Sequence, residues 1–268
     1  MDTLKYVSIQ NYVSAVLSLN LYYGHDIRSI RSEFEFCMTM SGVRRTLGDP
    51  EPHRPTLTIQ QLLLMSSYVN LQDPNEVCMW AAIVTGFRTL LRKSNLVPDT
   101  LTSASGHYLR RGAVDFADWG MTIQVSSSKT IQYAQRVHSI PVTCAVGSPL
   151  CAVTLLKAHF RSTPQRGVDS PAFMIWKSSG LVPLTYSALL KFLKALLKKA
   201  GLNSENVGLH SLRRAGALFM HNIGLSLEDI RQAGDWASMA ALLYLAKPFS
   251  LKVKSDLVVS RALLLGGY

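Results

Sequence analysis

A proline-rich stretch near the N-terminus restricts how this chain can fold more than any other sequence feature. The eleven residues LGDPEPHRPTL contain Gly48, Pro50, Pro52 and Pro55. Proline fixes its own φ, lacks a backbone N–H and disfavours helix at the preceding residue, so neither a helix nor a central strand can continue through this stretch. It therefore predicts a linker between a first domain at residues 1–50 and a second domain at residues 51–268.

Apolar periodicity predicts a mainly helical chain with one small antiparallel sheet. Helical patterns cover residues 7–21, 27–40, 58–69, 75–91, 149–160, 185–200, 211–223, 226–233 and 238–245. Between residues 107 and 142, β-branched residues alternate or cluster between polar turns, which is typical of short strands. We therefore expect the α+β class: a short helical domain, then a mainly helical domain with a three-stranded sheet.

Apolar runs and cysteines argue against a membrane or secreted protein. The longest apolar run, Val77–Val84, is far shorter than the ~18 residues of a spanning helix, and the N-terminus lacks a signal-peptide pattern. No CxxC pair occurs among the four cysteines, which are Cys37, Cys78, Cys144 and Cys151. We expect buried free thiols in a reducing compartment, with neither a zinc site nor disulfides.

Positive charge gathers in the C-terminal part of the chain. Lys and Arg number 28 against 17 Asp and Glu, a net charge of +11. Between Lys157 and Arg261 there are 15 basic and 6 acidic residues, so this part alone carries +9. Such an excess favours a polyanionic partner, with nucleic acid ahead of membrane, although a soluble protein with lysine-rich helix faces fits equally well.

Common catalytic motifs are missing from the sequence. It contains no GxxxxGK[ST], no HExxH and no GxSxG, and its carboxylates are few and dispersed. The sequence therefore offers no evident residues for a catalytic carboxylate pair or for a metal centre bound by carboxylates. If this chain is an enzyme, its chemistry rests on basic residues and a neutral nucleophile, and we expect no metal or other cofactor.

The densest polar signal is LHSLRRAGA, which starts at Leu209. His210 and Arg213 are three residues apart, so on a helix both can address one phosphate. A glycine turn, an amphipathic helix and the sequence GDWAS follow, and Tyr244 lies nine residues after Asp235. Taken singly, these residues fit a solvated helix face and a core tyrosine; their order and spacing together argue against coincidence.

This order resembles the C-terminal signature of the tyrosine recombinases, also called phage integrases. The resembling segment is HSLRRAGALFMHNIGLSLEDIRQAGDWASMAALLY, and the resemblance extends over about residues 55–250. The segment GDWAS, together with LLRKSNLVP upstream, is most similar to the recombinases of DIRS-type and Crypton-like eukaryotic transposable elements. The resemblance implies a tyrosine recombinase catalytic domain at residues 51–268, preceded by a partial helical core-binding domain, a DNA clamp, at residues 1–50.

The family also carries an upstream arginine and a hairpin lysine. Arg92 fits the first position because Ser94 and Leu96 keep the register of the family motif, while Arg88 is the rival. Lys129, in a polar turn between two β-like runs, fits the second. The weaker candidates for supporting the site or binding DNA are Lys93, Arg136, Arg214 and Trp236, with His138 beside Arg136.

Two positions depart from the family pattern. Asn95 replaces the usual glutamate, and Asp235 stands where members commonly have His or Trp as a phosphate donor. An ionised aspartate cannot donate a hydrogen bond and repels phosphate. Trp236 is one residue away and offers an indole N–H instead. The alternatives are an intact site with a shifted donor, a site that tolerates the loss, or a protein that has lost cleavage.

The resemblance implies a metal-independent reaction on double-stranded DNA. Arg92 and Arg213 would bind the phosphate, Tyr244 would form a 3′-phosphotyrosine, His210 would accept its proton and Lys129 would protonate the leaving 5′-oxygen. It also implies a homo-tetramer on paired DNA sites, and a nuclear location in a eukaryotic host or a cytoplasmic one otherwise. The alternative function is a recombinase-derived DNA-binding protein with weakened catalysis.

Overall fold

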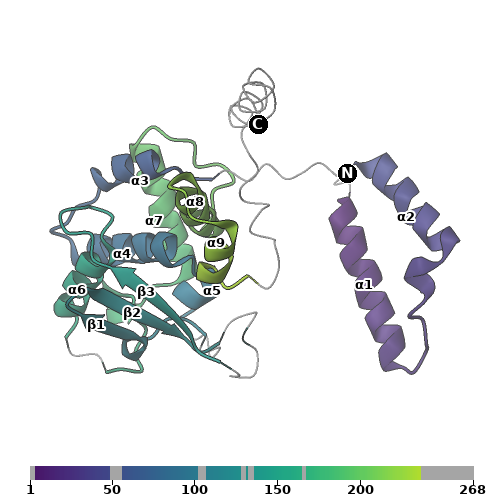
Figure 1. Ribbon diagram of the computed structural model, residues 1–268, viewed down its shortest axis with the longest axis horizontal. Coiled ribbons are helices and arrows are strands. Elements are labelled where there is room, and N and C mark those ends of the chain that lie inside the picture. Colours follow the sequence, from purple (N-terminus) through teal and green to yellow (C-terminus); the bar gives the residue numbers. More distant parts are fainter. Residues whose placement is uncertain are drawn as a thin grey trace, which may run out of the picture. The chain divides into compact units, whose positions relative to one another are not determined.

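The computed structural model describes residues 4–48, 56–101, 107–127, 131, 136–164 and 167–236 (Figure 1). The chain divides into two compact units, Met1–His53 and Arg54–Tyr268. Within the described ranges, no helix is both long enough and apolar enough to cross a lipid bilayer.

The first unit is a helical hairpin with little core. Its elements are α1 (Tyr6–Tyr22), a 3-10 turn η1 (Ile30–Ser32) and α2 (Phe34–Leu47). Arg31 donates to Ser14 at 2.8 Å, and the Arg44 guanidinium lies 5.8 Å from the centre of the Tyr6 ring. Tyr6, which is 9% exposed, is the one buried residue among residues 4–48. The helix predicted at residues 27–40 was misplaced, because a 3-10 turn precedes a helix that begins at Phe34.

The second unit is built around α4 (Pro74–Thr89). Asp73 caps this helix by accepting from the Asn75 N–H, and proline at the first position suits a helix start. Its residues from Trp80 to Phe87 are buried almost without exception, so α4 forms the centre of the core. The helices around it are α3 (Ile59–Ser66), α5 (Lys93–Leu96), α6 (Ala152–Ser162), α7 (Tyr186–Lys199), α8 (His210–Asn222) and α9 (Leu227–Ala233).

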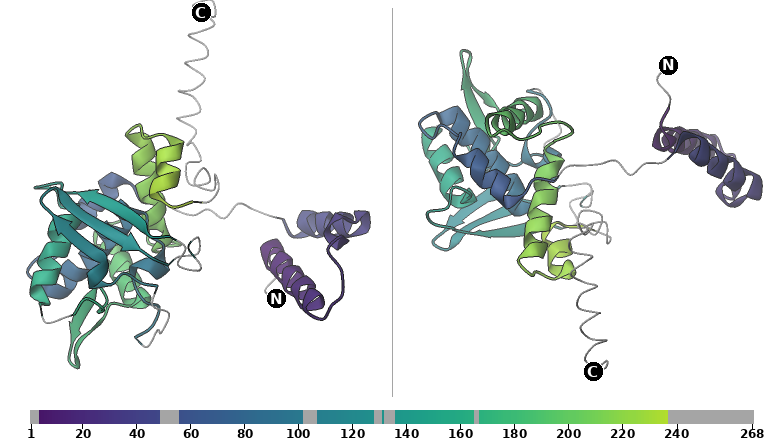
Figure 2. Two further views of the ribbon diagram at one scale, coloured as in Figure 1. Left: turned by 60° about the horizontal axis from the view of Figure 1, so that its bottom comes forward. Right: turned by 90° about the horizontal axis from the view of Figure 1, so that it is seen from above.

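A three-stranded antiparallel sheet covers part of this core (Figure 2). Its strands are β1 (Val114–Ala117), β2 (Gly120–Val125) and β3 (His138–Thr143), in that order, with a 3-10 turn η2 (Arg111–Ala113) ahead of β1. Met121, Ile123 and Val142 point into the core, as alternation predicts for a sheet with one covered face. The structure confirms both this sheet and the α+β class.

A second, two-stranded sheet was not predicted. It is the hairpin β4 (Met174–Lys177) and β5 (Gly180–Pro183). The Asn75 side chain, at the start of α4, bonds the backbone N–H and C=O of Trp176 at 2.6 and 2.9 Å. The hairpin therefore depends on a residue about a hundred positions earlier, which local sequence patterns do not reveal.

Candidate functional site

Arg213 of the HxxR motif is buried where three segments meet. It is 2% exposed, and its guanidinium donates to the carbonyl oxygens of Leu90, just after α4, and of Gly234, just after α9. The Trp236 ring lies over this guanidinium, with its centre 4.0 Å from Cζ. Hydrogen bonds and a cation–π contact offset the cost of burying the charge and hold the group in one orientation.

Two glycines allow Arg213 to reach these carbonyls. α8 crosses α4 at Gly216, where an added Cβ would lie 2.1 Å from the Phe87 carbonyl oxygen. At Gly234, a Cβ would lie 1.8 Å from a ring carbon of Trp236. Leu90 adopts a left-handed conformation (φ 54°), which ends α4 and turns the chain toward α5. The glycines of the motif thus have a packing role that follows from contact distances.

Arg92 approaches the same turn from α5. It is the N-cap residue of that helix, and its Nη2 donates to the Asp235 carbonyl oxygen at 3.5 Å. Arg92 and Arg213 therefore bind consecutive carbonyls, those of Asp235 and Gly234. The helix predicted at residues 75–91 is shorter in the structure, because α4 ends at Thr89 and the left-handed residue Leu90 separates it from α5.

The Asp235 carboxylate is engaged by a third arginine. It forms an ion pair with Arg136, which precedes β3. The Asp235 side chain is 14% exposed and that of Arg136 is 51% exposed, so the pair sits at the edge of the site with its cation toward solvent. Asp235 also has a left-handed conformation, with φ 50°, which Asp, Asn and His tolerate better than most residues.

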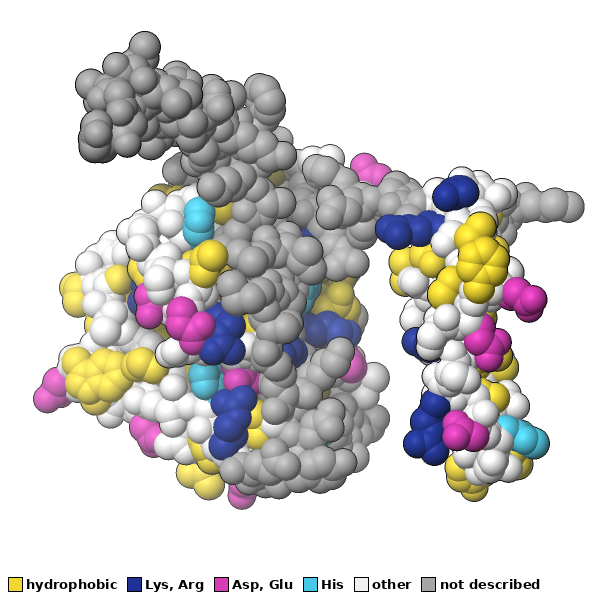
Figure 3. Space-filling view, turned by 45° about the vertical axis from the view of Figure 1, so that its right-hand side comes forward, with side chains coloured by type: hydrophobic (Ala, Val, Ile, Leu, Met, Phe, Trp, Pro, Cys, Tyr) yellow, Lys and Arg dark blue, Asp and Glu magenta, His cyan; other side chains and the backbone are white. Residues whose placement is uncertain are grey.

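A cavity of about 650 Å³ opens beside this turn. β3 and α9 form its walls, and its lining includes the charged residues Arg88, Arg136, Asp229, Arg231 and Asp235 together with His138. Arg88 also donates to the Thr143 carbonyl oxygen at 3.4 Å, so the rival of Arg92 lies at the same site. Where the surface of the second unit is described, Lys, Arg and His side chains lie beside acidic ones (Figure 3).

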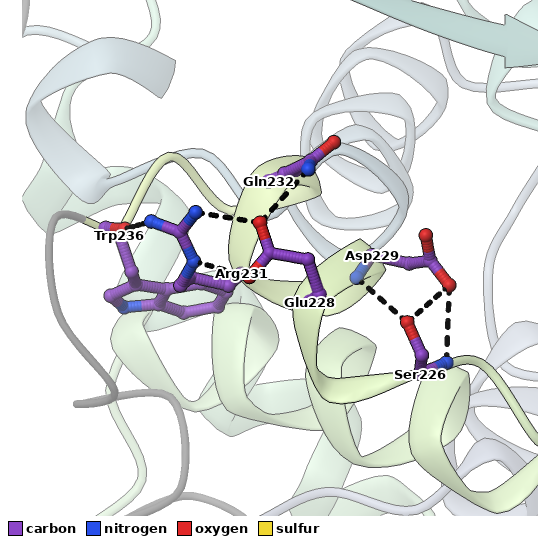
Figure 4. A network of polar contacts seen from close by, with 6 residues as sticks. All are labelled: Ser226, Glu228, Asp229, Arg231, Gln232 and Trp236. Atoms are coloured by element: carbon purple, nitrogen blue, oxygen red, sulfur yellow. Dashed lines mark hydrogen bonds and ion pairs between the residues drawn. The ribbon is translucent and has the colours of Figure 1, made fainter.

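Arg231 on α9 is a site residue that the sequence analysis missed. Its guanidinium donates to both carboxylate oxygens of Glu228 and to the Trp236 carbonyl oxygen at 3.1 Å (Figure 4). The hydrogen bonds from Arg231 and Gln232 lower the pKa of Glu228 to about 2. The i,i+3 spacing of Glu228 and Arg231 could have predicted their ion pair from the sequence. Only the fold shows that Arg231 also holds the turn that ends at Trp236.

Asn95 connects α5 to the end of β2. Its Nδ2 donates to the carbonyl oxygens of His107 and Ser127 at 2.9 and 2.7 Å, and the residue is 3% exposed. Ser127 lies two positions before Lys129. The residue that replaces the usual glutamate therefore braces the segment that leads to the predicted lysine.

The remaining predicted site residues have different surroundings. His210 is the first residue of α8 and is exposed. Arg214 is 5% exposed and donates to Ser211 at 3.0 Å. Lys93 pairs with Asp99 at 3.2 Å and lies 4.3 Å from the centre of the Tyr186 ring. Lys129 and Tyr244 lie outside the described residues.

The candidate site is rich in arginine side chains. Arg92, Arg213 and Arg136 come from three separate segments and all contact residues 234–235. Three guanidinium groups that contact the same two residues are suited to bind an oxyanion such as a phosphodiester. In the part of the chain that the structure describes, no group of three or more His, Cys, Asp or Glu side chains could hold a metal ion.

Known structures share this fold. No protein-family profile and no curated protein sequence matches the chain. XerH site-specific recombinase bound to its difH substrate is 14% identical, with a TM-score of 0.55, over 93% of this chain and 69% of that one. XerA recombinase is 18% identical, with a TM-score of 0.54, over 95% and 82%. The Tn1549 transposon integrase in complex with circular intermediate DNA is 17% identical, with a TM-score of 0.52, over 96% and 85%. The chain therefore has the α+β fold of tyrosine recombinases, as its resemblance to them implied.

Proposed function

We propose that this chain, which has a tyrosine recombinase fold, binds double-stranded DNA and cuts and rejoins its strands through Tyr244. The observation that carries the proposal is the convergence of Arg92 and Arg213 on the carbonyls of Asp235 and Gly234. Residues distant in sequence build one arginine-rich site. Tyr244 lies eight residues after Trp236, the last described residue of that site. DNA-bound recombinases among the structures with the same fold support the choice of partner.

The proposed reaction needs no metal. The Tyr244 phenolate attacks the phosphorus, the bond to the 5′-oxygen breaks, and a 3′-phosphotyrosine keeps the bond energy for rejoining. His210 accepts the phenol proton and Lys129 protonates the 5′-oxygen. Arg92 and Arg213 stabilise the charge on the equatorial phosphate oxygens. Contacts that hold Arg213 in place favour this role, because a preorganised donor is not reoriented during the reaction.

The assembly and the biological setting belong to the same proposal. The catalytic domain would act as part of a homo-tetramer on paired DNA sites, and the domain at residues 1–50, which contains the α1–α2 hairpin, would serve as a DNA clamp. The segments GDWAS and LLRKSNLVP support a DIRS-type or Crypton-like transposable element as the source of this chain. The segment after Tyr244, which would build the tetramer, lies outside the described residues.

A DNA-binding protein with weakened cleavage is the second candidate. The observation that favours it is the Asp235–Arg136 ion pair, which puts a carboxylate at the edge of the arginine site and occupies one of its cations. A carboxylate within ~5 Å of a phosphate would oppose its binding by ~1 kcal/mol even at a high effective dielectric.

Covalent capture distinguishes the two candidates. The DNA site is unknown, so the test uses a pool of nicked duplexes in which the bases around the nick are randomised. Cleavage near a nick releases a short fragment and traps the enzyme on the DNA, which is visible on a denaturing gel. An adduct supports the recombinase, binding without an adduct supports the second candidate, and no binding contradicts both.

Binding is expected to be strongly dependent on salt. The C-terminal part carries +9 of the net charge of +11, and each neutralised phosphate releases counterions. For a protein that contacts about six phosphates, affinity for duplex DNA should fall by about 10³-fold between 50 and 200 mM salt. Fluorescence anisotropy over a salt series measures this slope. A flat affinity over that range would contradict phosphate binding by this surface.

Replacing Asp235 should improve both binding and cleavage. Asp235→Asn removes the charge that pairs with Arg136, and DNA affinity should rise about fivefold, which corresponds to ~1 kcal/mol of lost repulsion. Asp235→His adds a phosphate donor as well and should also raise the rate of cleavage. Both residues tolerate the left-handed φ of 50°, so the turn should persist. Anisotropy and adduct formation provide the two measurements.

Two further variants control this test. Arg136→Ala removes the partner cation and should lower affinity in the wild-type background. Trp236→Ala tests whether Trp236 supplies the phosphate donor in place of residue 235. Its thermal unfolding has to be measured as well, because the Trp236 ring covers Arg213. If Asp235→His leaves cleavage unchanged while a folded Trp236→Ala protein loses it, Trp236 supplies the donor and Asp235 is not a defect.

A further inference from the structure

Two cysteines lie together at the connection between β3 and α6, outside the arginine site. Cys144 directly follows β3, Cys151 is the N-cap residue of α6, and their Sγ atoms are 3.6 Å apart. Backbone hydrogen bonds hold the turn between them, from Ser148 to Ala145 and from Cys151 to Ser148, both at 3.0 Å. The fold thus brings two free thiols together.

The Cys151 sulfur is surrounded by hydrogen-bond donors. It accepts from the backbone N–H of Ala145 at 3.3 Å and of Thr154 at 3.5 Å, and from the Thr154 hydroxyl at 3.1 Å. Burial alone would raise the pKa of the Cys151 thiol, but these hydrogen bonds outweigh burial and lower the pKa below its ordinary value. Because the thiolate is the nucleophile, these donors favour reaction at Cys151.

The four cysteines differ in access and environment, contrary to the expectation that all would be buried. Cys37 is exposed, Cys144 is partly buried, and Cys78 and Cys151 are buried. Burial raises the pKa of the Cys78 thiol, and this residue is inert by comparison. Cys144 is therefore the accessible member of the pair, and Cys151 is the better nucleophile.

We propose that Cys144 and Cys151 form a dithiol site that a small-molecule disulfide such as glutathione disulfide oxidises to an intramolecular disulfide. The Cys144 thiolate attacks one sulfur of glutathione disulfide, and one glutathione leaves. Cys151 then attacks the Cys144 sulfur of the mixed disulfide, the second glutathione leaves, and the Cys144–Cys151 bond forms. Two protein thiols lose two electrons and two protons, and one glutathione disulfide becomes two molecules of glutathione.

The geometry suits this step. A disulfide needs its sulfurs about 2.05 Å apart, and side-chain rotation of two residues whose sulfurs already touch can close the gap from 3.6 Å. The site also lies next to the arginine cavity, because Thr143, the neighbour of Cys144, accepts the hydrogen bond from Arg88. A bond between residues 144 and 151 would connect the end of β3 to the start of α6, and the first four residues of β3 line that cavity.

Mass spectrometry of the full chain tests this site. The protein is incubated with glutathione disulfide, alkylated with iodoacetamide and digested with trypsin, which leaves Cys144 and Cys151 in one peptide. We expect this peptide to be two hydrogen atoms lighter and unalkylated until it is reduced. Exposed Cys37 provides an internal control that should carry a stable mixed disulfide with glutathione.

Two variants separate the two thiols. Cys151→Ser removes the resolving thiol but keeps a good N-cap residue, so a glutathione mixed disulfide should persist on Cys144. Cys78→Ser is the matched control and should behave as the wild type. The proposal is overturned if glutathione modifies Cys37 while Cys144 and Cys151 are both alkylated, or if wild-type Cys144 keeps glutathione as the Cys151→Ser protein does.

Discussion

The Tyr244→Phe protein is expected to form no covalent adduct with any nicked duplex while it binds the same DNA with unchanged affinity. The substitution removes only the phenol oxygen, so the proposed nucleophile is lost and the shape and charge of the protein are kept. A loss of adduct by more than about 10³-fold corresponds to more than ~4 kcal/mol in the barrier. Denaturing gels measure the adduct, and anisotropy measures the affinity.

A second tyrosine serves as the matched control. Tyr68 is exposed in the same unit, and Tyr68→Phe should leave both the adduct and the affinity as in the wild type. An adduct that survives Tyr244→Phe would assign the nucleophile to another residue. If the wild type binds DNA and forms no adduct with the randomised pool, the second candidate function takes the place of the first.

The Arg213→Ala substitution should damage both the fold and the reaction. The buried carbonyls of Leu90 and Gly234 each lose a donor, at about 1–3 kcal/mol per unsatisfied group, and the contact with Trp236 is lost. We expect the free energy of unfolding to fall by about 2–4 kcal/mol. Cleavage should fall by about 10²–10³-fold, by analogy with the loss of one oxyanion donor. Urea denaturation and the rate of adduct formation provide the two measurements.

Arg92→Ala separates the two effects. Arg92 is half-buried, and its hydrogen bond to the Asp235 carbonyl oxygen is 3.5 Å long, so its removal should cost less stability. We expect a loss of cleavage similar to that of Arg213→Ala with a smaller change in the free energy of unfolding. A folded Arg213→Ala protein that cleaves at the wild-type rate would contradict a role for this arginine in the reaction and leave it a purely structural one.

Local signals were sufficient for most helices of the second unit. Thr58 and Ser226 form capping boxes at the starts of α3 and α9, and Thr185 caps α7, where the sequence places a residue of the expected type. Alternating β-branched residues likewise predicted β1, β2 and β3. Such elements are visible in sequence because their caps and apolar faces lie within a few residues of one another.

Where the sequence analysis failed, either a distant contact or a local backbone conformation that no residue pattern marks decides the structure. The β4–β5 hairpin depends on Asn75, and α2 begins late because a 3-10 turn at residues 30–32 comes before it. The helix predicted at residues 75–91 ends early, because the left-handed Leu90 terminates α4 and supplies the carbonyl that Arg213 binds. No periodicity marks such a residue.

The class of the fold and the order His210, Arg213, Asp235 and Tyr244 follow from residue patterns, because spacing along a helix and turn chemistry are local properties. What the polar groups contact depends on the packing of the folded chain. That packing buried Arg213 and Arg214, paired Asp235 with Arg136 and brought two cysteines within 3.6 Å. The physical reason is that hydrogen bonding, burial and ion pairing depend on which distant segments pack together, and α4 with its close approach at Gly216 sets that packing.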